Sequence, residues 1–275
     1  MTRSSPSVVR LLASATVSLA AWLAGRLADV ARWAVNLLRD LPVRAGRLAM
    51  TLWAGLAGPF RYPAWILERL AEPNPPTATR LVKATLLRVL AWLLRLLSRL
   101  ADLVGLPELV EWVLRAIARD TPLTPAEIAA AASVLGPDAL RWEEIRVAEG
   151  GLLRLIFARN EGRAFTVFHT IAIPSTGYSS RANLPILVHE LVHVYQHERA
   201  GSVYMGEAIY AQQTVGYDYG DADGLRRVRD VGKCYRDFNR EQQAQIVQDY
   251  FCRCQSDEDV AAYEPFIAEM CEGRI

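Results

Sequence analysis

The sequence contains few histidines and has almost no net charge. Both features limit the classes of protein and of binding partner that are expected for the chain. Four of its 275 residues are histidine, and 31 basic residues nearly balance 30 acidic ones, which leaves a net charge of +1. A chain so close to neutral has no overall basic field, so nucleic acid is not expected as a partner. The apolar fraction of 52% slightly exceeds the roughly 45–50% of soluble domains.

Cysteines are also few, and they gather at one end of the chain. Cys234, Cys252, Cys254 and Cys271 all lie in the last 42 residues. Such a cluster is compatible with two disulfides in an oxidising compartment, and equally with four free thiols in a reducing one. The C-x-C step differs from the C-x2-C spacing of zinc knuckles, so a cysteine-based zinc site is less well supported.

Long apolar runs free of charge are missing from the N-terminal half. Arg10 interrupts the apolar stretch 8–25, and no small-residue cleavage site precedes a polar start, so a cleavable signal peptide is not expected. Leu86–Leu97 approaches the hydrophobicity of a membrane span. It contains Arg88 and Arg95, however, and each would be costly at a bilayer centre unless it were paired or could reach the interface.

The two halves differ in composition, which predicts two modules, residues 1–120 and 121–275. Most of the leucine, alanine and tryptophan precedes residue 120, whereas all histidines and cysteines follow it. Apolar residues at helical spacing predict an all-helical first module. Pro42, Gly58-Pro59 and the proline cluster at 73–76 are expected to divide that module into hairpins.

Three interpretations of residues 1–120 remain open. Arg88, Arg95 and Arg99 follow steps of seven and four, so they form one cationic stripe on an otherwise apolar helix. The module could be a helical bundle with an arginine-bearing outer face. It could instead lie on or insert into a membrane surface through basic amphipathic helices with tryptophan. It could also be a docking segment that a chaperone or a secretion apparatus recognises.

The second module is expected to mix helices with short strands, which makes the whole chain α+β. Thr124 as N-cap, Pro125 and Glu127 predict a helix that ends near Leu135. Alternating apolar residues and turn signals predict short antiparallel strands at 144–147, 153–157 and 164–173, and Pro174 suggests that the last one is an edge strand. From about residue 184 the chain is again expected to be helical, beginning with a motif-bearing helix and followed by C-terminal helices.

That motif helix carries His189, Glu190 and His193 in an H-E-x-x-H pattern between aliphatic residues. On a helix, positions i and i+4 share a face, so both imidazoles can address one zinc ion. Glu190 lies on the adjoining face, where its carboxylate can act as general base towards the attacking water. Two of only four histidines fall in this pattern, so we expect a zinc site.

Zinc needs a third protein ligand, and the sequence offers two glutamates for it. His197 continues the i+4 series but cannot close around the same ion on a straight helix, and the late histidine of metzincins is absent. Glu207 follows His193 by 14 residues and Glu241 by 48. Glu241 is preferred, because Asn239 is a plausible helix cap and the small Ala244 would permit close approach; Glu207 remains the alternative.

Three segments of the second module resemble a group of zincin-like proteins encoded near type VI spike and Rhs genes or other contractile injection systems. The segments are H-E-L-V-H-V-Y-Q from His189, A-Q-x-x-x-G-Y-D-Y from Ala211 and F-N-R-E-Q-Q-A-Q-I-V-x-D-Y from Phe238. The resemblance covers about residues 121–255. It implies a gluzincin-type metallopeptidase site with His189, His193 and a downstream glutamate as ligands, and it favours Glu241.

Other polar residues receive narrower expectations. Tyr217 and Tyr219 are candidates to stabilise the oxyanion of a tetrahedral intermediate. Gln196 and Gln212 are candidates to orient the metal ligands. His169, alone on a predicted strand, is interpreted as a hydrogen-bonded core histidine.

These observations lead us to expect a zinc metallopeptidase that acts on a peptide or protein substrate, with an extended peptide pairing to the predicted edge strand. The resemblance suggests an effector or toxin that stays in the bacterial cytoplasm until it is exported or injected. One alternative is a non-catalytic injection-system component with a structural zinc. Another is a membrane-perturbing protein that acts through its N-terminal helices.

Overall fold

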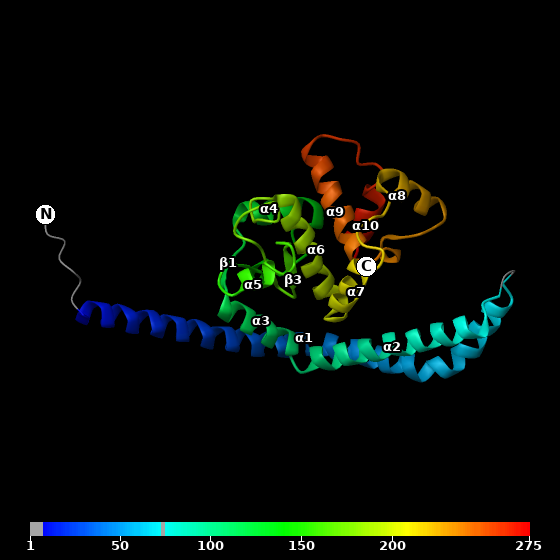
Figure 1. The fold of residues 1–275 in the computed structure, drawn as a ribbon, viewed down its shortest axis with the longest axis horizontal. Helices are drawn as coiled ribbons and strands as arrows, with labels where there is room; N and C mark the ends of the chain where they lie inside the picture. Colours follow the sequence, from blue (N-terminus) through cyan, green and yellow to red (C-terminus); the bar gives the residue numbers. More distant parts are fainter. Residues whose placement is uncertain (1–7, 73–74) are drawn as a thin grey trace.

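The chain folds as a mixed α+β structure that is mostly helical, with one small sheet (Figure 1). The computed structural model describes residues 8–72 and 75–275. The longer elements, in chain order, are α1 (Val8–Leu70), α2 (Ala78–Leu103), α3 (Leu106–Ile117), β1 (Arg119–Pro122), α4 (Pro125–Leu135), β2 (Arg146–Glu149), α5 (Leu153–Phe157), β3 (Phe165–Val167), β4 (Thr170–Ala172), α6 (Leu184–Ala200), α7 (Val203–Gln212), α8 (Asp221–Asp230), α9 (Arg240–Gln255) and α10 (Glu264–Cys271). Short 3-10 turns lie at Trp142–Glu144 and Tyr235–Asp237.

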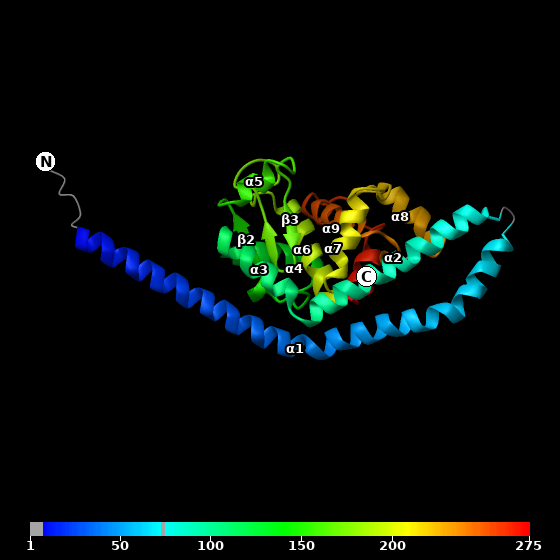
Figure 2. The same ribbon diagram turned by 60° about the horizontal axis from the view of Figure 1, so that its bottom comes forward.

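The first module is helical, but the expected series of hairpins is wrong: α1, which ends at Leu70, and α2, which begins at Ala78, form one long hairpin. Residues 73 and 74 of the proline cluster expected to form a turn lie outside the described residues. Pro42 and Pro59 are inside α1, together with Pro63. A proline removes one helical hydrogen bond and bends the helix without ending it when the flanking turns continue, and α1 is visibly bent in Figure 2. Within the described residues, no helix combines the length and apolar character that a membrane span requires.

The sheet has the order β1-β2-β4-β3. It is mixed rather than antiparallel as expected, because β2 pairs in parallel with β4 while the two outer pairs are antiparallel. The expected module boundary at residue 120 falls inside β1, which pairs with β2 along its whole length. The strand predicted at 144–147 begins two residues later, after the first 3-10 turn.

The strand predicted at 153–157 is wrong, since these residues form helix α5. Leu153 and Phe157 are buried, whereas Leu155 is exposed. A spacing of four residues between the buried side chains matches one helical face and not the alternation of a strand. The apolar run was therefore too short for its period to be recognised in the sequence.

The segment predicted as one strand at 164–173 is a tight hairpin of β3 and β4. Phe168, between them, has a φ of 58° in the left-handed region, which reverses the chain. Consequently β4 lies inside the sheet, and the strand next to Pro174 is not the edge. The free edge on this side belongs to β3.

The main core lies between the sheet, α4, α6, α9 and α10. Helix α4 begins and ends where predicted, with a capping box between Thr124 and Glu127. Helix α9 begins after Asn239, whose side chain accepts from the backbone of Gln242, and this confirms the predicted cap. Helix α6 packs most extensively against α9, and its residues Leu187–His197 are all buried.

The hairpin is joined to the second module at the C-terminus of α6. Arg47 donates to the carbonyl oxygens of Glu198 and Arg199, both at 2.8 Å, and Arg99 donates to that of Ala200. The next residue, Gly201, has a φ of +73° and lies so close to Asp102 that a Cβ would clash with the carboxylate. Glycine is therefore required at this junction.

Candidate metal centre

Helix α6 presents two histidines of the H-E-x-x-H pattern on one face, as their spacing predicts. His189 and His193 are both about 6% exposed, and their rings meet edge to face with centroids 5.1 Å apart. The surrounding aliphatic side chains of α6 are buried in the core, which fixes the rotation of the helix about its axis. Both imidazoles are thereby held towards α9.

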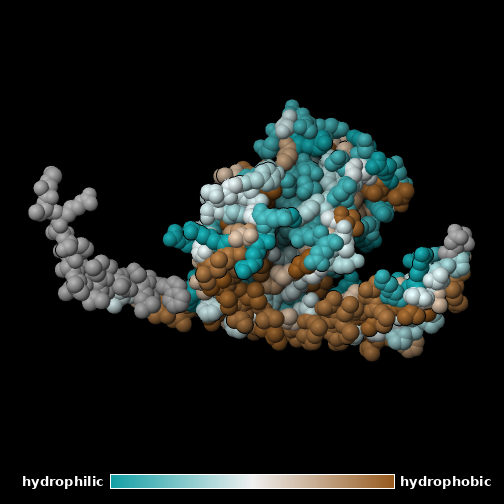
Figure 3. Space-filling model, in the orientation of Figure 1, coloured by the Kyte–Doolittle hydropathy of each residue, from teal (hydrophilic) through white to brown (hydrophobic). Residues whose placement is uncertain are grey.

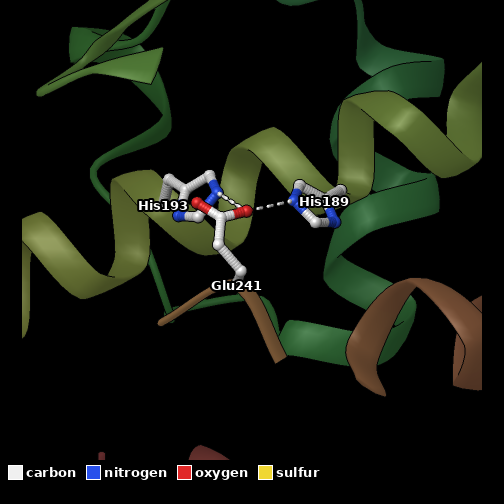
Figure 4. A group of neighbouring side chains, drawn as sticks. All are labelled: His189, His193 and Glu241. Atoms are coloured by element: carbon white, nitrogen blue, oxygen red, sulfur yellow. Dashed lines mark ion pairs between the residues drawn. The ribbon is translucent and has the colours of Figure 1, made fainter. Parts of the chain in front are cut away.

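Helix α9 supplies Glu241 between the two imidazoles (Figure 4). Its Oε2 atom lies 3.5 Å from Nε2 of His189 and 3.6 Å from Nε2 of His193. Glu241 is only 1% exposed, and Ala244, one turn further along, is fully buried and lets α9 approach α6 closely. One ligand atom from each of the three residues falls within 4.8 Å of the others, so the group could bind a metal ion.

The geometry fits a small tetrahedral cation better than a set of direct hydrogen bonds. With metal–ligand bonds of about 2.0–2.1 Å, two ligand atoms of a tetrahedral site are about 3.4 Å apart, close to both measured separations. The two distances from Glu241 Oε2 to the imidazole nitrogens are longer than ordinary hydrogen bonds. In addition, Glu241 Oε2 is buried without a hydrogen-bond donor among the described residues. A buried carboxylate oxygen rarely stays without a partner, and a cation between the three groups would satisfy it.

A chain of amide side chains orients the ligands from behind. Gln196 Oε1 lies 2.9 Å from Nδ1 of His193, so a proton on Nδ1 leaves Nε2 free to bind metal. The Gln196 amide in turn donates to the carbonyl of Arg240, the residue before Glu241, and to Gln243. Gln212 on α7 donates to Oε1 of Glu241 at 2.9 Å. Both glutamines singled out in the sequence therefore contact the ligands.

Without a metal ion, the ionisation of Glu241 and that of the two histidines strongly affect each other. Burial would lower the pKa of His193, but the Glu241 carboxylate outweighs it and raises that pKa to about 9. Burial works against ionisation of Glu241, yet the two imidazoles hold its pKa well below the usual range. The carboxylate is therefore ionised at neutral pH and available as an anionic ligand.

Glu190 is held beside the three candidate ligands by a residue that the sequence did not identify. The hydroxyl of Thr166 on β3 lies 2.7 Å from Oε2 of Glu190 and donates to it. Tyr204 on α7 fixes this strand, because its hydroxyl accepts from the Phe168 amide and donates to the Thr166 carbonyl. The Tyr204 ring also stacks against His193. No sequence spacing links these residues, so only the fold reveals them.

A cavity of about 250 Å³ opens onto these groups. Its walls include the ligands, Glu190, the edge strand β3 and one side of α7. Tyr217 lines it with its ring centroid 5.8 Å from that of His189. Burial, together with the negative charge of Glu241 and Glu190, raises the pKa of Tyr217 to about 12, so its hydroxyl keeps its proton and can donate a hydrogen bond.

Two other candidates from the sequence lie outside this arrangement. Tyr219 does not line the cavity: its hydroxyl donates to Asp249 at 2.5 Å and contacts Tyr263, so it is not placed to stabilise an oxyanion. Glu207 does not meet the histidines. Its carboxylate accepts from Arg240 at 2.8 Å and pairs with Arg95 of α2 at 3.5 Å. The structure thus brings Glu241, and not Glu207, to the two imidazoles.

The remaining histidines are His197, one turn further along α6, and His169, which lies in the turn between β3 and β4 and not on a strand as predicted. His197 contacts the rings of Phe168 and His169 and stays outside the ligand group, as expected from helix geometry. Burial keeps its pKa well below the ordinary value. His169 is buried with Nε2 3.1 Å from Glu198, which confirms its interpretation as a hydrogen-bonded core histidine.

Comparisons with known proteins add no relative to this description. No family model matches the chain, and neither a curated protein nor a solved structure matches it.

Proposed function

We propose that the chain is a zinc-dependent peptidase whose second module is a small zincin-like domain. The observation that carries the proposal is the buried carboxylate of Glu241, which lies 3.5–3.6 Å from both histidine Nε2 atoms with Glu190 in the same cavity. Two imidazoles and one carboxylate, at tetrahedral spacing and with a fourth direction open to a cavity, are a ligand set typical of catalytic zinc. When bound there, zinc would supply a Lewis acid that polarises the scissile carbonyl and acidifies water.

In this proposal Glu190 moves the proton. Thr166 donates to Oε2 of Glu190 and thereby holds the carboxylate in one orientation, so Oε1 is left to accept a proton from the attacking water. The same carboxyl group would then return the proton to the leaving amine. Tyr217 would donate to the oxyanion, since its hydroxyl stays protonated and lines the cavity.

The substrate we propose is an extended peptide. Residues Phe165–Val167 of β3 form a wall of the cavity, and β3 is the outermost strand on this side of the sheet. An extended peptide can pair with such an edge through main-chain hydrogen bonds, which places its backbone beside the reacting groups. The main-chain pairing would give affinity without restricting the side chains of the substrate.

The experiment that tests catalysis is Glu190→Gln, assayed on a mixture of denatured proteins and on cell-wall peptides. We expect zinc content to stay at that of the unaltered chain, because Glu190 is not one of the three ligands, and hydrolysis to fall by about two to four orders of magnitude. Hydrolysis that persists in the Glu190→Gln chain would refute the peptidase proposal. A chain that holds zinc but hydrolyses nothing, with or without the substitution, would indicate a structural metal.

We also propose that the chain is an effector delivered by a contractile injection or type VI secretion system. This proposal rests on the sequence resemblance over residues 121–255. The unaltered chain and the Glu190→Gln chain are each expressed in a susceptible bacterium, once in the cytoplasm and once directed to the periplasm. The unaltered chain should arrest growth in at least one compartment, and the Glu190→Gln chain should arrest it in neither. Equal growth arrest by both chains would separate toxicity from the metal centre.

A further inference from the structure

Exposed large apolar side chains are concentrated on the N-terminal helices. Within the described residues, 29 of 37 such side chains lie between Leu23 and Ile117, on α1, α2, α3 and their connections. Figure 3 shows the hydrophobic surface running along the side of the molecule that these helices form, whereas the remainder is mainly hydrophilic. A soluble monomer seldom exposes so extensive an apolar face, which indicates an interaction surface.

On both helices of the hairpin, the exposed apolar side chains repeat at helical spacing. The stripe on α1 includes side chains separated by three, four and seven residues, namely Trp53, Leu56, Phe60 and Leu67. The stripe on α2 has the same character, with Leu86, Leu90, Leu93 and Leu97. Phe60 is 86% exposed and Trp53 67%. Each helix is therefore amphipathic with its apolar face unpartnered.

Charge is segregated between the hairpin and the rest of the chain. Residues 8–103 contain 13 basic and 5 acidic residues, whereas residues 104–275 contain 17 basic and 25 acidic ones. The near-neutral net charge of the whole chain therefore results from a basic hairpin and an acidic remainder. We call this remainder, residues 104–275, which contains the candidate metal site, the metal domain. A strongly basic amphipathic hairpin is attracted to negatively charged surfaces.

Cations without an acidic partner gather near the turn of the hairpin. Arg61, Arg80, Lys83 and Arg88 are exposed, and none of them pairs with a carboxylate among the described residues. Arg88 lies over the ring of Trp65 at 3.9 Å instead. Closer to the metal domain, by contrast, Arg95 pairs with Glu207. Among the exposed cations of the hairpin, these four near its turn are therefore the ones left without a carboxylate partner in the described part of the chain.

We propose that the α1–α2 hairpin binds the surface of an anionic lipid bilayer. Its apolar stripes would lie in the interfacial layer, with the helix axes parallel to the membrane plane, while the arginines and Lys83 on the polar side face the lipid headgroups and water. Trp53 and Phe60 are exposed aromatic side chains of the kind that amphipathic helices insert at this depth. The metal domain, which is acidic, would be held above the bilayer. This placement goes beyond the proposed peptidase activity.

A bilayer fits this face better than a second copy of the chain does. Two hairpins packed apolar face to apolar face would bring two basic segments together, and their charges would repel. The face is also very long: on α1 its exposed apolar side chains run from Leu23 to Leu70 and, at 1.5 Å per residue, extend about 70 Å along the helix. A standard protein interface covers only about 800 Å² on each partner, so most of the stripe would remain exposed.

Vesicle binding by the full chain tests this proposal. We expect flotation with vesicles of phosphatidylcholine and phosphatidylglycerol, little flotation with phosphatidylcholine alone, and release at high salt. The double variant Trp53→Gln/Phe60→Gln should bind about tenfold more weakly or worse, because two exposed aromatic side chains are lost. Lys83→Gln and Arg61→Gln should each weaken binding about fivefold.

The matched control is Leu155→Gln/Val231→Gln, which replaces two side chains that are 60% and 72% exposed on the metal domain. It should bind vesicles like the unaltered chain, and circular dichroism should show that all variants are folded. Equal binding to both kinds of vesicle, or equal loss in the control, would overturn the proposal. So would the absence of vesicle binding together with a dimer, seen by light scattering, that Trp53→Gln/Phe60→Gln abolishes.

Discussion

The proposal that Glu241 is the third ligand of a zinc site can be tested by replacing it with glutamine. The amide keeps the volume of the side chain, and its oxygen can still accept from Gln212, so the packing of α9 on α6 should survive. What is lost is the negative charge, at an oxygen that lies 3.5–3.6 Å from the two imidazole Nε2 atoms. The substitution therefore changes the ligand set and leaves its surroundings nearly intact.

The loss of zinc-binding free energy expected for Glu241→Gln can be estimated from the number of protein ligands. Zinc sites in small domains bind with apparent free energies of about 10–16 kcal/mol at neutral pH. If three protein ligands share this free energy, each contributes about 3–5 kcal/mol. A neutral amide oxygen recovers part of one contribution, so we expect Glu241→Gln to lose about 3 kcal/mol, which corresponds to an affinity roughly a hundredfold lower.

The matched control is Glu207→Gln, which removes the same charge from the other candidate glutamate. Glu207 pairs with Arg240 at 2.8 Å and does not meet the histidines, so zinc affinity should change by less than about threefold. Competition with a chromogenic chelator measures both affinities, and metal content after dialysis gives the stoichiometry. Loss of zinc in Glu207→Gln with retention in Glu241→Gln would refute the assignment.

Three further predictions concern the base, the junction and the ligands. Thr166→Val removes the hydroxyl that donates to Glu190, so kcat should fall about tenfold with zinc content unchanged; an unaltered kcat would show that Thr166 does not orient the base. Asp102→Ala removes the acceptor of the Ser202 amide and the carboxylate that pairs with Arg99 at a buried junction, which should lower the free energy of unfolding by about 2–4 kcal/mol in urea titrations. Burial lowers the pKa of His193, but Glu241 raises it to about 9 in the metal-free chain. A proton therefore competes with zinc below that pH, and affinity should rise up to about tenfold per pH unit from pH 7 to 9. The raised pKa of His193 has the opposite effect on the stability of the chain without metal. The stability that this raised pKa contributes is fully present below about pH 6.5 and is lost as the pH rises through about 9. Calorimetry in buffers of different ionisation enthalpy measures the released proton, and affinity that does not vary over this range would contradict the prediction.

Two of the three candidate metal ligands could be predicted from the sequence because helix periodicity fixes how His189 and His193 lie relative to each other. The i, i+4 spacing of His189 and His193 determines a shared face whatever the rest of the fold. Glu241 required more: the cap at Asn239 and the small Ala244 indicated a helix that could approach closely, and the structure places it there. Thr166 could not be predicted in the same way, because its contact with Glu190 depends on a strand of only three residues.

Predictions were wrong for short elements, because a short apolar segment does not distinguish the helical repeat from the alternation of a strand. Leu153–Phe157 is five residues long, so its apolar residues suit a strand as well as one helical turn. The hairpin at Phe168 depends on a left-handed residue that is not glycine, and the sequence gives no turn signal there. Conversely, Pro42 and Pro59 are strong turn signals that α1 absorbs by bending, because uninterrupted helical turns on both sides outweigh one missing hydrogen bond.

The contacts between the hairpin and the C-terminus of α6 explain why the sequence predicts two separate modules although the fold joins them closely. Arg47 and Arg99 belong to the basic hairpin, and their partners are main-chain carbonyls at residues 198–200, which no residue pattern reveals. Those carbonyls are the last of the helix that carries His189 and His193, and they have no acceptor role within it. The arginines of the hairpin thus satisfy the C-terminal carbonyls of the helix that carries both histidines. A chain cut at residue 120 would keep every ligand and still leave these carbonyls, and the Ser202 amide held by Asp102, without their partners. The hairpin would therefore both hold the chain at a bilayer and support the helix on which the metal centre is built.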